Sequence, residues 1–454
     1  MQKIIKSRKK ALYLLAFMGL AFVSCELDEI QDPNGLSLAE TEQNAILGVL
    51  NELVVGVQSS ARNGIGIETT ASGTIARELY LFDADPRNTG DLLGKDGSAL
   101  NNNSFYSTAQ WNGNYRSIKN ANILLNALDN TNAITETEKN GYRGFAKTFQ
   151  AYEFIQILKS YGQARIDVAD EENLGAILDF DAAIAEVRTL LNEALTDLNN
   201  AGDTFLFPIA GFSDLVSDTD TGLSVSDFIE FNRAVAAVAA LYDGDGDAAL
   251  TALQNSYFDL NGSLAVGPRF LFSLGAGDRA NPVFRSPSES AESPNNGDQI
   301  IVHNSWINDA EPNDLRVAEK AALRPSPSVQ DGLNGTHETR LYASNLSSID
   351  ILRNEELVLV YAEANILTNN LPEAVVALDV IRTSANLPVY LGAITTEALT
   401  DEMLTQRRYS LWSENHRLFD LRRYNRINET VLPIDREGDR LFEVLPIPLS
   451  ENAD

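Results

Sequence analysis

Long blocks of the chain repeat apolar residues with the period of an amphipathic helix. Ser37 to Val57, Trp111 to Leu128, Thr135 to Tyr161 and Phe180 to Leu198 each place large apolar side chains three, four and seven residues apart. This spacing gathers those side chains on one face of a helix, where they can pack against a neighbouring element. Alternating patterns typical of strands are few and short. The pattern therefore predicts a mainly α protein.

Two later blocks look like copies of one unit. Residues 231–253 and 357–382 align so that Ala236 meets Ala362. Both blocks read as a helix, a short polar turn and a second helix, with alanines where the two helices approach each other. This unit resembles a tetratricopeptide repeat, and the earlier helix pairs at 111–161 and 135–198 are candidates for more divergent copies.

Two stretches between these blocks show no helical period. Residues 59–110 and 261–345 are rich in glycine, asparagine, proline and serine. They are too long to be simple connectors, and long ordered loops usually carry function. We therefore expect ligand-binding residues in these two stretches.

The N-terminus has the pattern of a signal peptide. Residues 1–10 hold five basic residues and no acid, and 13 uncharged residues follow, which is too short for a membrane-spanning helix. Small Ser24 follows this run and precedes Cys25, which is the only cysteine of the chain. The pattern resembles the lipobox of bacterial lipoproteins, in which the cysteine carries lipid, so we predict a signal peptide over residues 1–24 and lipid attachment at Cys25. The alternative is an ordinary secretory signal.

The chain after the predicted cleavage point is strongly acidic. Cleavage before Cys25 leaves 30 basic residues against 64 acidic ones, a net charge of −34. Such a surface argues against nucleic acid as a partner, because binding phosphates needs Lys and Arg. Residues 25–36 begin with a cluster of acids, which is either a solvated tether or a signal for export to the cell surface, as in lipoproteins of Bacteroidetes-type bacteria.

The sequence holds no motif typical of catalysis. The three histidines do not pair at helical spacing, and the serine elbow of hydrolases and the phosphate loop of nucleotide-binding proteins are absent. A carboxylate pair for glycoside hydrolysis stays open, because sequence does not show which of the 64 acids meet in space. We expect no catalytic residue, no metal ligand and no cofactor.

The acidic run DGDGD at residues 243–247 has two interpretations. Alternating acids are typical of the calcium loop of an EF-hand. However, that loop needs glycine at its sixth position and glutamate at its twelfth, where this chain has Ala248 and Gln254. We favour a turn between two repeat helices.

Trp306 is the first candidate for contact with a ligand. It lies in a polar segment with His303 and Asn308. An exposed aromatic ring beside amides suits a sugar, which offers an apolar C–H face and hydroxyl groups. The alternative is that Trp306 fastens its own segment to the helices.

Tyr80 and Phe82 form a second candidate cluster. They are followed by Arg87 in the run LYLFDADPRNTG, in which two aspartates also occur. The same combination of aromatic and polar groups suits a sugar. Here too, the alternative is that the aromatic side chains only pin the loop to the scaffold.

An ordered series of motifs runs through the C-terminal half. It comprises Arg353, Tyr361 to Ala364, Ile381-Arg382, Glu414, Arg417, Asp420 to Arg423 and Pro446 to Pro448. Together these motifs resemble the SusD/RagB family. The helical segments at 111–125 and 142–162 resemble the family's first half.

The resemblance implies a SusD-like scaffold of about four tetratricopeptide-like helix pairs, with long loops and a few short strands. It also implies an outer-membrane lipoprotein facing the medium, which binds oligosaccharide or peptide and delivers it to a TonB-dependent transporter of the SusC type. We expect one domain over residues 37–454, with parts 37–260 and 261–454. A surface glycan-degrading enzyme and a protein-binding repeat scaffold are the alternatives.

The charged C-terminal motif has a structural interpretation. Arg407, Arg417 and Asp420 are spaced to brace one helix against another. We therefore predict a network of ion pairs there rather than a ligand site. Trp111 and Trp412 lie in helical patterns and are predicted to be core residues.

Overall fold

The computed structural model describes residues 44–217, 222–288 and 298–452. The predicted signal peptide, Cys25 and the tether at 25–36 lie outside these residues, so what the sequence indicates for them stays a prediction. Within the described part, no helix is both long enough and apolar enough to cross a membrane.

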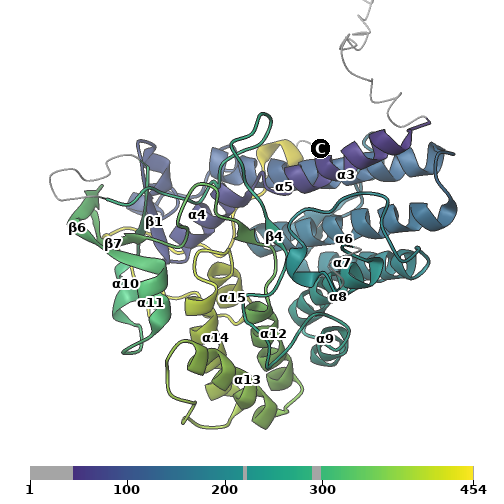
Figure 1. The fold of residues 1–454 in the computed structure, drawn as a ribbon. Coiled ribbons are helices and arrows are strands. Elements are labelled where there is room, and N and C mark those ends of the chain that lie inside the picture. The colour runs from purple at the N-terminus through teal and green to yellow at the C-terminus, as the bar shows by residue number, and fades with distance from the viewer. Residues whose placement is uncertain (1–43, 218–221, 289–297, 453–454) are drawn as a thin grey trace, which may run out of the picture.

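Antiparallel helix pairs form the scaffold, stacked side by side in Figure 1. Each helix packs on the next, including α9 on α12, which are separated by the long segment between residues 253 and 354. The four pairs are α3 (Leu47–Ser60) with α5 (Phe105–Asn130), α6 (Glu136–Tyr161) with α7 (Phe180–Asn199), α8 (Val225–Tyr242) with α9 (Gly246–Leu253), and α12 (Asn354–Leu367) with α13 (Leu371–Ser384). The predicted mainly α, tetratricopeptide-like fold is confirmed.

Local sequence signals fix where these helices begin and end. Helix α6 starts with a capping box, in which Thr135 and Glu138 each satisfy a free backbone N–H of the other. It ends at Gly162, whose φ of 69° is a left-handed conformation that favours glycine. Helix α8 has a second capping box, formed by Ser224 and Asp227. The signals at α6 agree with the predicted block 135–161, whereas α8 begins six residues before the predicted block 231–253.

The DGDGD segment forms the turn between α8 and α9. Asp245 caps α9 by accepting a hydrogen bond from the backbone N–H of Ala248. Both Asp243 and Asp245 also pair with Arg188 of α7. Among the described residues, no three His, Cys, Asp or Glu side chains gather closely enough to hold a metal ion.

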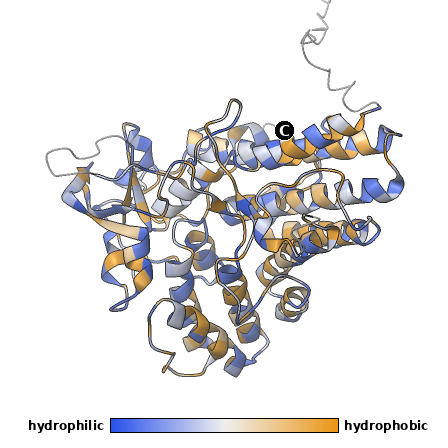
Figure 2. Cartoon of the chain, in the orientation of Figure 1, coloured by the Kyte–Doolittle hydropathy of each residue, from blue (hydrophilic) through white to orange (hydrophobic). Residues whose placement is uncertain are grey.

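The core consists of the facing stripes of the helices, and Figure 2 shows hydrophobic and hydrophilic residues on the same helices throughout. Seven phenylalanines from α6, α8 and the segment between α7 and α8 make a continuous cluster of ring contacts. They are Phe145, Phe149, Phe205, Phe207, Phe212, Phe228 and Phe231. Trp111 and Trp412 are buried, as predicted.

A four-stranded antiparallel sheet lies beside the helical stack, with α10 and α11 below it in Figure 1. Its strand order is β1-β5-β7-β6, so segments from three distant parts of the chain meet in it. The strands are β1 (Leu79–Phe82), β5 (Gln299–Val302), β7 (Leu333–Thr339) and β6 (Ala321–Gln330). Two-stranded sheets join β2 (Gln163–Arg165) to β3 (Ile177–Asp179) and β4 (Arg269–Phe270) to β8 (Ile349–Asp350).

The two stretches expected to be irregular contain more structure than predicted. The first holds α4 (Ile65–Ile75), and the second holds strands together with α10 (Asn304–Asn308) and α11 (Leu315–Lys320). Helix α4 lacks a helical period because every residue from Glu68 to Ile75 is buried, whichever way it points. The remaining helices are α14 (Thr396–Ser410), α15 (Arg417–Arg423) and the 3-10 turns η1 (Pro86–Asn88), η2 (Lys95–Gly97), η3 (Ser213–Leu215) and η4 (Leu449–Asn452).

Candidate functional site

The sheet brings together three of the predicted site residues. Tyr80 and Phe82 lie on β1, which pairs with β5, and His303 directly follows β5. The ring of Tyr80 stacks on that of Phe82 at 5.5 Å between centroids, and it lies 5.0 Å from the ring of His303. One residue of the first candidate cluster therefore lies beside two residues of the second.

This cluster faces the interior. Tyr80, Phe82 and His303 are each 3% exposed. His303 bridges Ser305 and Asp435 through its two ring nitrogens, at 2.8 and 2.9 Å. The arrangement fits the alternative that these aromatic side chains fasten their own segments. A direct contact of the three with ligand stays an untested prediction.

The interpretation of Trp306 as an exposed aromatic residue is wrong. It lies on α10 with no exposed surface, and its ring lies 5.1 Å from that of Tyr409 and 5.3 Å from that of Trp412. Its Nε1–H donates to the backbone oxygen of Arg408 at 3.2 Å. The polar neighbours misled the prediction, because α10 turns Asn308 to solvent and Trp306 to the core.

An open groove of about 420 Å³ lies beside Asp83, Asp85 and Arg87, the polar residues that follow Tyr80 and Phe82 in the chain. Arg87, on the 3-10 turn after β1, forms one wall together with Phe105 at the start of α5. The Arg87 guanidinium lies 4.7 Å from the centroid of the Phe105 ring, within the range of a cation–π contact. Arg285 and Asp298, which pair at 3.0 Å, lie on the other side.

Hydrogen bonds hold the polar groups of the groove in place. Arg87 donates to both carboxylate oxygens of Asp85, with Nε–Oδ1 at 2.9 Å and Nη2–Oδ2 at 2.6 Å. These bonds lower the pKa of Asp85. Asp83 accepts from the backbone of Asp85 at 2.9 Å and from the side chain of Asn88 at 2.8 Å. The groove thus offers a half-buried aromatic ring, a planar cation and charged carboxylates, which suits a polyhydroxylated ligand.

Sequence reasoning identified Arg87 and missed Phe105, Arg285 and Asp298. Phe105 begins a helix whose first turn lies before the part with a clear apolar period. Arg285 and Asp298 come from a segment about 200 residues away that only the folded chain brings to η1. The proline- and serine-rich composition around them was the available signal, since it marked a long loop.

Comparison with known proteins relates part of the chain to a family. Residues 329–441 match the model of the SusD family. A search of curated proteins found no match.

Solved structures of the SusD superfamily share the fold over most of the chain. A SusD superfamily protein from Bacteroides vulgatus has a TM-score of 0.68 at 15% identity, and surface glycan-binding protein A from Bacteroides thetaiotaomicron has 0.67 at 16%. The structure of the latter protein in complex with laminarihexaose has 0.64 at 15%. Each alignment covers 89% of this chain and 96% of the other.

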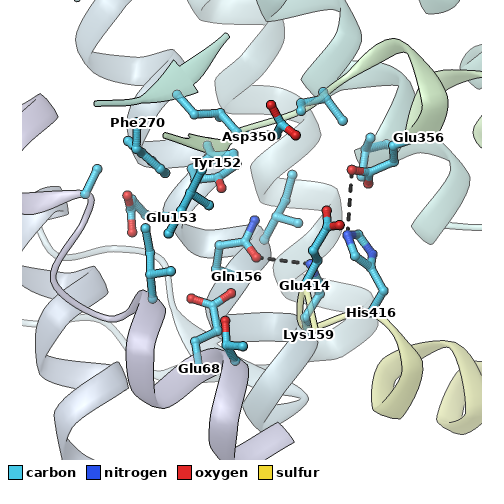
Figure 3. A pocket seen from close by; sticks show the side chains of 18 of the residues that line it. Glu68, Tyr152, Glu153, Gln156, Lys159, Phe270, Asp350, Glu356, Glu414 and His416 are labelled. Atoms are coloured by element: carbon cyan, nitrogen blue, oxygen red, sulfur yellow. Dashed lines mark hydrogen bonds and ion pairs between the residues drawn. The ribbon is translucent and has the colours of Figure 1, made fainter. Parts of the chain in front are cut away.

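The protein also has a polar cavity, shown in Figure 3. Its walls come from α4, α6, α12 and the turn before α15, which contribute Glu68, Glu153, Lys159, Glu356 and His416. Its volume of about 70 Å³ is room for a few water molecules and is too small for a sugar ring.

Burial shifts the pKa values of the ionisable side chains that line this cavity. It raises the pKa of Glu68, Glu153 and Glu356, and it lowers the pKa of Lys159 and His416. These shifts favour the neutral form of each group. We interpret the cavity as a structural junction between the first helix pairs and the last one.

The predicted ion-pair network at the C-terminal motif is present, with one difference. Arg407 donates to Asp420 at 2.6 Å, and Asp420 also accepts from Arg423 at 2.8 Å. The prediction that Arg417 joins this network is wrong, because Arg417 makes no ion pair with a described residue. Its charge instead faces Glu78 and Arg408, and burial lowers its pKa to about 9.

Replacing Glu78 by glutamine should stabilise the protein at alkaline pH. Burial raises the pKa of the Glu78 carboxyl from 4.5 to about 7, so the folded protein keeps a proton that the unfolded chain releases. The stability gained from this group is complete below pH 4.5 and is lost as the pH rises to about 7. Between about pH 5 and about pH 8, the free energy of unfolding of Glu78→Gln relative to the original protein should rise by roughly 2–3 kcal/mol.

Denaturant unfolding at the two pH values measures this difference. Glu429→Gln, which changes an exposed glutamate, is the control and should show no such change. A difference for Glu78→Gln that is independent of pH would show that the Glu78 carboxyl already titrates normally in the folded protein.

Proposed function

We propose that this protein is a cell-surface nutrient-binding lipoprotein that captures oligosaccharide and delivers it to a partner TonB-dependent transporter of the SusC type. The observation that carries the proposal is the groove in which Arg87 stacks on Phe105 beside charged carboxylates. A flat apolar ring with hydrogen-bonding groups around it matches the C–H face and the hydroxyls of a sugar. The fold shared with a surface glycan-binding protein supports the assignment.

The groove is suited to binding rather than to hydrolysis. A glycosidase needs one protonated carboxylic acid to protonate the leaving oxygen. In this groove Asp85 is held charged by Arg87, and Asp298 is paired with Arg285. Asp83 is hydrogen-bonded to Asn88. With its carboxylates engaged in these contacts, the groove is better suited to holding a glycan than to cutting it. No cofactor is part of this proposal.

Lipid on Cys25 would hold the protein in the outer membrane, facing the medium. Two or more acyl chains give a stable anchor, at about 0.8 kcal/mol for each buried methylene. The mass of the N-terminal peptide from cells tests this part, since an unmodified residue 25 would contradict it.

Replacing Phe105 by alanine should weaken glycan binding by at least about tenfold, roughly 1.4 kcal/mol, because it removes the ring and the support of Arg87. Affinity electrophoresis against a panel of glycans identifies a ligand that retards the original protein. Isothermal titration with that ligand then measures the loss. Leu391→Ala, which trims a side chain 87% exposed outside the groove, is the control and should bind normally.

The same experiments separate the alternatives. Release of shorter sugars from the glycan would favour a surface glycan-degrading enzyme. Absence of both retardation and products across the panel would favour a repeat scaffold that binds only protein. If Phe105→Ala kept full affinity for the glycan, the glycan site would lie outside this groove.

A further inference from the structure

A second open groove, of about 600 Å³, runs between α7, α8 and α9. Its floor is made by alanines from α8 and α9, and its edges carry amides. The residues that matter here are Asn192 and Asn199 of α7, Arg233, Ala236 and Ala240 of α8, and Ala248 of α9. It shares no lining residue with the groove at Phe105.

Arg233 is the unusual feature of this groove. It is 9% exposed and makes no ion pair with a described carboxylate. Within the described part of the chain, its guanidinium donates only to neutral oxygens, those of Asn232 at 2.8 Å, of Asn192 at 3.1 Å and of the Leu191 backbone at 2.8 Å. Burial lowers its pKa to about 10.

A buried cation without a counter-ion is costly, and this chain has acids in excess. Its 64 acidic residues outnumber its 35 basic ones. Arg188, at the edge of the same groove, is paired with both Asp243 and Asp245. The missing acid at Arg233 therefore marks a place where a ligand can supply the negative charge. One N–H of the Arg233 Nη1 remains for it, because that nitrogen bonds only Asn192 among the described residues.

The other groups of the groove indicate whether the ligand that supplies the carboxylate is a sugar or a peptide. Among the residues that the structure describes, no aromatic side chain lines this groove, so it lacks the flat platform that a sugar ring prefers. Asn192 and Asn199 lie seven positions apart on α7, or about 10.5 Å along the helix. This matches about three residues of an extended peptide at ~3.3 Å each. The Asn192 side-chain nitrogen makes no hydrogen bond with a described residue and is available to a peptide carbonyl.

We propose that the groove between α7, α8 and α9 binds an extended peptide segment with an acidic side chain, whose carboxylate pairs with Arg233. The alanine floor lets the peptide backbone approach the helices closely, while the asparagines hydrogen-bond to it. The carboxylate completes a charge-assisted pair with the buried guanidinium of Arg233. The proposal is independent of glycan binding, because it concerns a separate groove.

The experiment uses two pools of capped random nonapeptides, one with a fixed central glutamate and one with glutamine in its place. Equilibrium dialysis against the full-length protein, followed by mass spectrometry, measures how strongly each pool is retained. We expect at least about tenfold higher retention of the glutamate pool, the effect of one charge-assisted pair. Equal retention of the two pools, or retention of neither, would overturn the proposal.

Two variants locate the site. Arg233→Met should abolish the preference for glutamate, and Thr251→Trp should abolish retention of both pools by filling the groove from its exposed edge. Thr251→Trp leaves Arg233 and its hydrogen bonds in place. It therefore still tests whether peptides bind in this groove if Arg233→Met unfolds. Arg426→Gln, which removes an exposed arginine paired with Asp401, should retain peptides normally. A preference for glutamate that persists in Thr251→Trp would contradict the proposed site.

Hexagalacturonate distinguishes an acidic peptide from an acidic glycan, because it carries the same carboxylates on sugar rings. If it bound with the same dependence on Arg233 and Thr251, the occupant would be an acidic glycan and the peptide proposal would fail. Glycan affinity should be unchanged in Arg233→Met and Thr251→Trp, and peptide retention should be unchanged in Phe105→Ala, so each proposal can fail alone.

Discussion

Replacing Trp306 by alanine should lower the free energy of unfolding by about 3–5 kcal/mol and leave the glycan affinity of the folded protein unchanged. The ring has no exposed surface and fills the space between Tyr409 and Trp412. Its loss leaves a cavity and an unpartnered backbone oxygen at Arg408. Urea unfolding measures the loss of stability, and titration with the glycan ligand measures affinity.

Asn308→Ala is the matched control for Trp306→Ala, because Asn308 lies on the exposed side of the same helix α10. It should change the free energy of unfolding by no more than about 0.5 kcal/mol. If Trp306→Ala lowered glycan affinity at normal stability, Trp306 would be a ligand contact after all. The structure would then have to open at α10 to expose it.

Replacing Asp420 by asparagine should lower the free energy of unfolding by about 3–5 kcal/mol, because it leaves the charge of Arg407 buried without a carboxylate. Both residues are almost fully buried, at 3% and 1% exposed. Arg423 is affected less, because it also pairs with Glu363. Asp401→Asn, which breaks an exposed pair with Arg426, is the control and should cost at most about 1 kcal/mol.

The pH dependence of the Asp420 effect follows from its titration. Burial raises the pKa of Asp420, but the charges of Arg407 and Arg423 outweigh this and lower it below 3.8. The stability from this group is therefore present above pH 3.8 and is lost as the pH falls through the lower folded-state value. Unfolding measurements should show a constant cost of Asp420→Asn at neutral pH that shrinks in strong acid. A cost that persists unchanged in acid would mean that the carboxylate charge is not what stabilises the folded protein.

The helices show which elements can be predicted from the spacing of apolar residues. The block at 180–198 coincides with α7 almost to the residue, because α7 has one buried face and one solvated face. The block at 135–161 coincides with α6 as well, although every residue from 153 to 161 is buried, because its large apolar side chains keep the helical spacing. Helix α4 was missed because it is buried on all sides and consists mainly of small and polar residues, so it shows no apolar period.

The candidate site shows the limit of composition as a guide. A tryptophan among polar residues at 303–309 has the composition of an exposed ligand contact, yet the short helix α10 separates its polar side from its apolar one. In the second cluster the aromatic residues of β1 face inward, whereas Arg87 reaches the surface. Composition placed the loops correctly, but it did not show which side chain of each loop points outward.

The sequence by itself determined most of the helices, the two helix-turn-helix units at 231–253 and 357–382, and the ion pair of Arg407 with Asp420, because these depend on residues close together in the chain. The pairing of α3 with α5, 45 residues further on, came only from the structure. Only the tertiary structure decided that Phe105, Arg285 and Asp298 meet in one groove, and that Arg233 lacks a carboxylate partner in another. The physical reason is that a groove is the gap left between elements after packing. Its lining depends on which helices and strands come to lie side by side, and this is set by the burial of the whole core rather than by any one segment.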